Sequence, residues 1–204
     1  MSPQQLEEDN RNKASEHLSS EGRKYFNLIE FDANEELVME IRKHPIGATL
    51  IMITGGFVVL ATLILTAFIA SVDLNAFFNV TSLNGLRAVI VIISLFISIF
   101  AIAGTFIGLF LYKSNVIYVT SEKIAQILYT SLFNRKISQL SIGDVQDVTV
   151  TQNGILAHMF NYGMLVIETA GEQQNYTFTF VPEPYAKSKA IVGTHERNLV
   201  NYGN

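Results

Sequence analysis

The sequence contains no cysteine among its 204 residues. Disulfide bonds, thiolate metal sites and a cysteine nucleophile are therefore excluded, and the absence agrees with a reducing compartment. A glycine-rich phosphate loop and the GxSxG and HExxH motifs are also absent. The four histidines lie far apart, without the spacing of metal ligands: His17, His44, His158 and His195. We therefore expect no enzyme activity and no catalytic, cofactor or metal site.

A surplus of basic residues is missing as well. Residues 1–45 carry ten acidic and six basic side chains, and residues 113–204 carry seven of each. A nucleic-acid-binding domain needs a basic stripe, so this class of protein is excluded. Asp144 and Asp147, three residues apart, are a carboxylate pair that we expect to cap turns rather than to act as acid and base.

Two long runs contain no Asp, Glu or Lys. The first covers residues 46–71. The second is apolar from residue 86 to Leu111, within a span that we place at residues 86–112, and its single charge is Arg87 near the start. A helix of about 20 apolar residues crosses a bilayer, so each run is long enough. The alternative is a pair of buried helices in a soluble core, but soluble helices of this length normally keep a polar face. We predict a transmembrane hairpin with a short connector at residues 72–85.

The flanking charges predict the orientation of this hairpin. Arg42, Lys43 and His44 precede the first run and Lys113 follows the second, whereas the connector holds Asp73 and no basic residue. Positive charge is retained on the cytoplasmic side of membranes. We expect a multi-pass protein of the plasma (inner) membrane with both termini in the cytoplasm, and Arg87 reaching toward the interface.

The segment before the first run divides into two parts. Residues 1–34 are mostly polar, and we predict a disordered tail. Within the juxtamembrane segment 35–45, apolar and polar residues alternate from Leu37 to Arg42, which favours a strand. A short helix is the alternative, because Leu37, Val38 and Ile41 also fit helical spacing.

Gly104 and Gly108 form a GxxxG pair in the second run. Small residues at this spacing let two helix backbones approach closely. A homo-oligomer seam is one interpretation. Packing against the first run, where Gly55 and Gly56 offer a groove, is the one that we favour.

After Lys113 the pattern changes to short alternating apolar stretches separated by turns. We predict six strands, at residues 115–120, 123–130, 135–142, 145–152, 163–169 and 175–181. A helix should follow from Glu183 to about Val192, with a tail at 193–204, because Pro182 and Pro184 end the last strand. The expected fold class is α+β, with an antiparallel barrel or sandwich closed by one helix. Gly163, at the entry to a strand, should need either a positive φ or close backbone contact.

Four motifs occur in a fixed order behind the hairpin: VIYVTSEKI at residues 116–124, LFNRK at 132–136, SIGDVQDV at 141–148 and FNYGMLVIET at 160–169. Together with EELVMEIRKHP at 35–45, they resemble the bacterial pleckstrin-homology-like membrane proteins over residues 35–192. The chain departs from the family pattern at Lys123, Ser131 and Asn161, where Arg, Gly and Gly are usual.

The resemblance implies a two-helix transmembrane hairpin carrying a cytoplasmic PH-like domain over residues 113–192, and it transfers no catalytic residue. Two functions follow as alternatives. One is a scaffold that binds a protein or peptide partner, and the other is a sensor of lipid head groups. Positive charge at the first turn of the domain would favour lipid, but there Lys123 stands beside Glu122.

Overall fold

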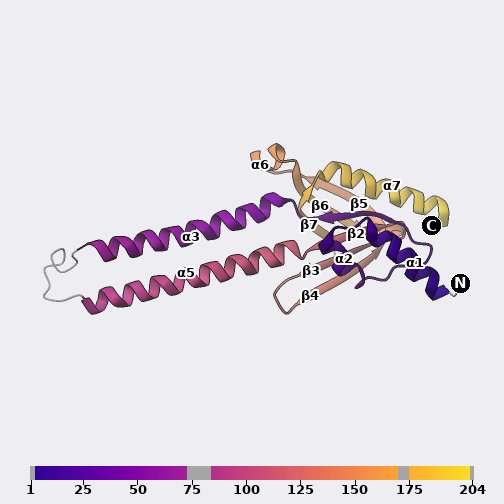
Figure 1. Ribbon diagram of the computed structural model, residues 1–204. Helices are drawn as coiled ribbons and strands as arrows, with labels where there is room; N and C mark the ends of the chain where they lie inside the picture. The colour runs from indigo at the N-terminus through magenta and orange to yellow at the C-terminus, as the bar shows by residue number, and fades with distance from the viewer. Residues whose placement is uncertain (1–2, 73–83, 170–174, 203–204) are drawn as a thin grey trace. The chain divides into compact units, whose positions relative to one another are not determined.

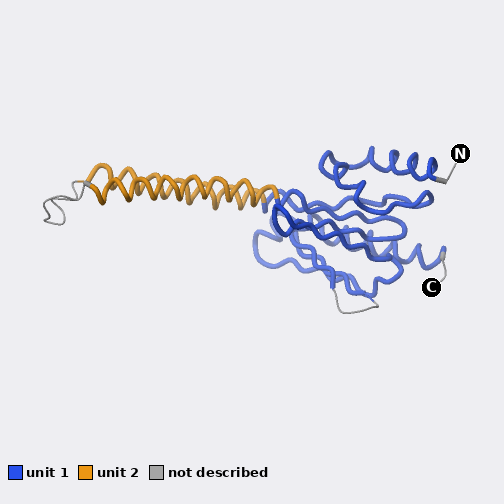
Figure 2. The backbone as a smooth tube through the Cα atoms, turned by 90° about the horizontal axis from the view of Figure 1, so that it is seen from below, with its two compact units in different colours: residues 1–47, 111–204 blue, residues 48–110 orange. Residues whose placement is uncertain are grey.

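The computed structural model describes residues 3–72, 84–169 and 175–202. The chain forms two compact units, which Figure 2 shows in different colours. One consists of residues 1–47 and 111–204, and the other of residues 48–110. The predicted connector lies almost wholly outside the described residues.

The second unit is a pair of long antiparallel helices, α3 (Pro45–Ser71) and α5 (Asn84–Lys113) (Figure 1). Both are long and apolar enough to cross a membrane, and only 6% and 11% of their most apolar stretches are buried. A core helix of a soluble protein would be largely buried. This low burial favours the membrane interpretation over the soluble one.

Hydroxyl groups join the two helices. Thr62 Oγ1 lies 2.7 Å from Ser98 Oγ, and Thr66 Oγ1 lies 2.5 Å from Ser94 Oγ. Arg87 donates to the carbonyls that end α3, at 2.9 Å to Ile69 and 2.6 Å to Ala70. Its guanidinium therefore caps the negative end of a helix.

The glycines of the two long helices differ in what surrounds them. Gly55 and Gly108 face the neighbouring helix, against Thr105 and Ile51 respectively. A Cβ added to Gly56 or Gly104 would meet no atom within 4 Å. Packing within the hairpin thus accounts for Gly108, whereas the homo-oligomer interpretation stays a prediction.

The first unit contains two antiparallel sheets (Figure 1). The four-stranded sheet has the order β1 (Leu37–Arg42), β2 (Val116–Thr120), β3 (Lys123–Tyr129), β4 (Arg135–Ser141). The three-stranded sheet has the order β5 (Val145–Thr151), β6 (Tyr162–Thr169), β7 (Tyr176–Pro182). All six strands predicted after Lys113 are confirmed, to within one residue at each end.

The predicted strand before the first helix is confirmed as well. β1 pairs with β2 in antiparallel register, with Arg42 opposite Val116 and Ile41 opposite Ile117. The domain therefore has seven strands in the described residues, one more than residues 113–192 supply. The short helices η1 (Ile142–Asp144) and α6 (Ile155–Met159), in the links before and after β5, were not predicted.

The main core lies between the two sheets and includes Ile117, Val119, Ile167 and Phe178. Helix α7 (Pro184–Tyr202) packs on β5, β6 and η1 and contributes the buried Ile191. The prediction that this helix ends near Val192, with a tail beyond, is wrong. The buried Thr194 and a hydrogen bond from Asn198 Nδ2 to the carbonyl of Ser121 hold its last turns on the domain.

The N-terminal segment is also not a disordered tail. It forms α1 (Pro3–Glu16) and α2 (Ser20–Phe26), and residues of and after α2 cover the outer face of the four-stranded sheet. Phe26 and Phe31 pack there with Tyr118 and Ile127. Polar side chains of α1 join this layer, since Asn10 donates to the carbonyl of Glu35 at 2.7 Å. The prediction failed because these contacts join residues far apart in the sequence.

Candidate functional site

The β2–β3 turn is the first turn of the domain, where free positive charge would favour a lipid head group, and its one basic side chain is already paired. Lys123 Nζ lies 3.1 Å from Glu35 Oε2 and 3.2 Å from Asp32 Oδ2. It also donates to the carbonyl of Glu30 at 3.3 Å. The side chain of Lys123 is only 15% exposed.

Glu35, the main partner of Lys123, has no exposed surface. Its carboxylate also accepts hydrogen bonds from the hydroxyl of Thr120 and, at 3.0 Å, from the backbone N–H of Asp32. A buried carboxylate must be paired and hydrogen-bonded, and this one is both. Burial by itself lowers the pKa of Lys123, but the hydrogen bonds and charges of Glu35 and Asp32 outweigh it, so that the pKa is raised.

Carboxylate oxygens of Asp32, Glu35 and Glu122 lie within 4.8 Å of one another. Such a group could hold a metal ion, but the Lys123 ammonium is already bonded to two of its three members. The cluster is therefore best described as a structural ion pair that fixes the segment before β1 to the β2–β3 turn.

The adjacent basic pair of the domain, Arg135 and Lys136, lies away from this turn. In the β3–β4 register, Lys123 faces Ser141 at one end and Tyr129 faces Arg135 at the other. Arg135 lies over the Tyr129 ring, 6.0 Å from its centroid. The adjacent pair Arg135 and Lys136 is therefore a full strand length away from Lys123.

The histidines and the Asp144–Asp147 pair do not form a site either. His195 Nδ1 bonds to the carbonyl of Ile142 at 2.7 Å, and His44 Nδ1 accepts from the N–H of Ile46 at 3.1 Å. Asp147 accepts a hydrogen bond from Thr149 at 2.8 Å. His195, His44 and Asp147 thus each have a local structural partner.

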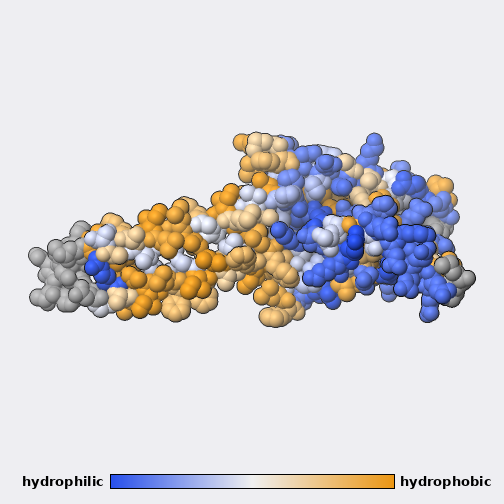
Figure 3. Space-filling view, in the orientation of Figure 1, coloured by the Kyte–Doolittle hydropathy of each residue, from blue (hydrophilic) through white to orange (hydrophobic). Residues whose placement is uncertain are grey.

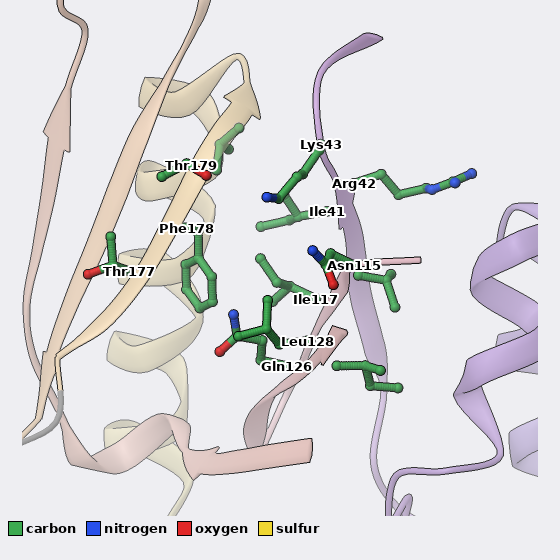
Figure 4. A pocket seen from close by; sticks show the side chains of 13 residues that line it. Ile41, Arg42, Lys43, Asn115, Ile117, Gln126, Leu128, Thr177, Phe178 and Thr179 are labelled. Atoms are coloured by element: carbon green, nitrogen blue, oxygen red, sulfur yellow. The ribbon is translucent and has the colours of Figure 1, made fainter. Parts of the chain in front are cut away.

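A cavity lies between the two sheets, where β1 approaches β7 (Figure 4). Its volume is about 110 Å³. The buried Ile41, Ile117 and Phe178 form its apolar floor. More exposed side chains line its mouth: Lys43, Asn115, Gln126, Thr177 and Thr179. The alternation along β7 places Phe178 inside and Thr177 and Thr179 at the rim.

Lys43 contributes a positively charged group to the mouth of this cavity. Figure 4 shows its side chain directed toward β7, whereas the side chain of Arg42 points away. Partial burial lowers the pKa of Lys43. Its Nζ lies 5.2 Å from the centroid of the Tyr112 ring, and no acidic side chain of the described residues forms an ion pair with it. An ammonium in this setting is suited to donate hydrogen bonds to a carboxylate or carbonyl oxygen of a ligand.

The sequence did not predict this cavity. Its lining comes from four separate parts of the chain, at residues 41–43, 115–117, 126–128 and 177–181. The sequence predicted only the strands themselves, because the packing of the two sheets that brings β1 next to β7 is not encoded by any local motif.

Comparison with known proteins places the fold in context. The family model described as "Bacterial PH domain" matches residues 46–190, which include both long apolar helices and all strands after them. No curated protein is significantly similar to the chain. One solved structure that resembles it is a DUF1696 family protein with a pleckstrin-homology domain from Shewanella loihica PV-4, at 14% identity and a TM-score of 0.32. That match covers 40% of this chain and 70% of the other. Because the family model covers well over half of the sequence, the chain belongs to the bacterial PH domain family.

Proposed function

We propose that the protein is a non-enzymatic interaction module, held at the inner membrane by the α3–α5 hairpin and displaying its PH-like domain in the cytoplasm. The low burial of both helices supports the anchor. The flanking Arg42, Lys43 and Lys113 support the orientation, because basic residues are retained on the cytoplasmic side.

A protein or peptide partner is favoured over lipid head groups by one observation, the pairing of Lys123 with Glu35 and Asp32. A cation that binds a phosphate must be accessible, whereas the ammonium of Lys123 is already paired with two carboxylates. The β2–β3 turn therefore offers no free ammonium of Lys123 to a lipid head group.

The cavity between the sheets is the proposed binding site. Ligand pockets for small molecules usually have volumes of about 300–1,000 Å³. A cavity of about 110 Å³ is closer to the size of one apolar side chain. We infer that it takes an anchoring side chain of a peptide, with Lys43 bonding to a carboxylate or carbonyl of the same ligand.

The experiment is site-specific photocrosslinking of the full chain in its native membranes. A photoreactive amino acid at Thr179, an exposed residue at the mouth of the cavity, should give a discrete protein adduct. The same amino acid at Val200, which is 85% exposed on α7, is the matched control and should not. Gln126→Trp, which places a larger side chain over the cavity, should remove the adduct. Adducts to lipid alone would contradict the proposal.

Lipid sensing is the second candidate, and the exposed pair Arg135 and Lys136 is the observation in its favour. Each basic residue near an anionic surface contributes about 1 kcal/mol, so recruitment needs several. We expect the domain to show no marked preference for anionic lipid. Label accessibility of Asn134→Cys, an exposed position that keeps both basic residues, should be equal in anionic and neutral nanodiscs at physiological salt. Strong, salt-sensitive protection in the anionic discs, lost on reversing Lys136 to Glu, would favour the sensor instead.

A further inference from the structure

Two segments of the PH-like domain expose apolar side chains at their tips. In the β3–β4 turn, Phe133 is 98% exposed and Leu132 is 43% exposed. In and just after α6, Ile155 is 85% exposed and Met159 is 63% exposed, with Leu156 and Phe160 exposed beside them. Figure 3 shows hydrophobic surface at both places. Contiguous apolar surface of this kind marks a contact with another protein or with a membrane.

Strand register places both segments at the same end of the domain. Val116 faces Ile127 and Tyr129 faces Arg135, so the β3–β4 turn lies at the end where β2 begins. Tyr162 faces Pro182, so the link that contains α6 lies at the end where β7 finishes. The N–H of His44 donates to the carbonyl of Phe180 at 2.6 Å, which joins these two ends. Figure 1 shows α6 and the β3–β4 turn on one side of the two sheets.

This end is also the one through which the chain runs into both long helices. β1 ends at Arg42 and α3 begins at Pro45, whereas α5 ends at Lys113 and β2 begins at Val116. Arg42 Nη2 donates to the carbonyl of Lys113 at 3.2 Å, so the two links are adjacent. If the helices span the bilayer, as proposed above, this end is within a few residues of its surface.

We propose that the β3–β4 turn and α6 insert their apolar side chains into the interface of the bilayer and hold the domain against the membrane. This inference rests on the proposed membrane anchor. Continuity of the chain favours lipid over a protein partner as the occupant, because the links at His44 and Lys113 confine this end to the bilayer surface. Apolar insertion requires no anionic lipid, in agreement with the neutral charge balance of residues 113–204.

The lack of cysteine makes the test direct, because each introduced cysteine is the single labelling site. Full-length protein in neutral liposomes carries an environment-sensitive fluorophore at Phe133→Cys or Ile155→Cys. Val200→Cys is the matched control, since Val200 is as exposed as Ile155 and lies near the opposite end of α7 from β7. Phe100→Cys, within α5, reports on the span itself.

Nitroxide groups on the lipids should quench the labels at positions 133 and 155 and leave the label at 200 unquenched. A water-soluble quencher should give the opposite pattern. Quenching by lipid at position 100 but not at 133 and 155 would overturn this inference and leave the anchor intact. Protection of 133 and 155 from both quenchers would also overturn it, in favour of a second protein chain. Lack of lipid quenching at position 100 would overturn the anchor instead.

Discussion

Glu35 carries a carboxylate with no exposed surface, and its partner Lys123 is the residue on which the choice between lipid and protein depends. Lys123→Met keeps the aliphatic stem but leaves that carboxylate without its ammonium. Loss of one partner of a buried ion pair costs about 3 kcal/mol. We expect the free energy of unfolding in urea, followed by tyrosine fluorescence, to fall by about that amount.

The control for this change is Lys189→Met, which removes an exposed charge from α7. It should leave the unfolding midpoint nearly unchanged. Replacing both partners, with Glu35→Leu added to Lys123→Met, should recover part of the loss because no unpaired carboxylate is then buried. Equal midpoints for Lys123→Met and the parent would show that the pair is not structural.

Gly163 was predicted to need a positive φ or close backbone contact, and the second of these is confirmed. A Cβ at this position would lie 2.7 Å from the carbonyl oxygen of Thr151 and 3.0 Å from Pro184 Cγ. Gly163→Val should therefore cost about 2 kcal/mol of folding free energy in the same urea assay. Gly193→Val, where nothing lies within 4 Å, should not be destabilising.

His44 should make the stability of the domain depend on pH. Burial lowers the pKa of His44, and its Nδ1 accepts from the N–H of Ile46 only when it is unprotonated. A lowered pKa in the folded state contributes stability that is present above the unfolded value of about 6.5 and is lost as pH falls through the folded one.

Unfolding midpoints measured between pH 8 and pH 5 should therefore decrease, with the carboxylates adding to the loss at the acid end. His44→Asn keeps an acceptor at the start of α3 but does not titrate in this range. The difference between the two proteins isolates the histidine. A difference that is constant with pH would contradict the assignment.

At the level of secondary structure elements, α2 and the segment after it cover the outer face of β2 and β3. Every residue of β2 is buried, since Ile117 and Val119 face the core between the sheets and Val116 and Tyr118 face the N-terminal layer. Phe26 lies at the centre of that layer, 5.3 Å from Tyr118 between ring centroids.

We expect Phe26→Ala to cost about 3–4 kcal/mol, because it removes a fully buried ring. Leu6→Ala on α1, where the side chain is 47% exposed, should cost far less. Equal effects in the urea assay would mean that the N-terminal helices do not pack as described. The same layer implies that a fragment starting at Lys113 exposes the outer face of β2, so binding experiments should use the full chain.

For the whole molecule, the orientation of the hairpin is the central prediction. A topology reporter fused after Asn204 should be located in the cytoplasm, and one inserted near Asn79 should be located outside. The reason is that Arg42, Lys43 and Lys113 are expected to stay on the cytoplasmic side. Replacing these three residues with Gln should weaken the bias. Opposite locations of the two reporters in the parent protein would contradict the proposed function.

The sequence alone predicted the elements whose signals are local. The two apolar runs are recognisable because each is uniform over more than 20 residues, and the strands from Val116 to Pro182 because their alternation repeats every two residues. β1 was predicted for the same reason, whereas its pairing with β2 is shown by the structure. The length and low burial of α3 and α5 agree with the interpretation of the two apolar runs as membrane-spanning helices.

Features that depend on contacts between residues far apart in the sequence were revealed only by the tertiary structure. Helix α1 has little apolar surface of its own, and Asn10 and Arg11 hold it in place through carbonyls of Glu35 and Ile29. α7 extends past Val192 because β5 and the β2–β3 turn offer it partners there. The pairing of Lys123 with Glu35, 88 positions away, and the cavity between β1 and β7 arise from the same cause. Contacts of this kind stabilise an element only after the rest of the chain has folded around it, so no local pattern of residues records them.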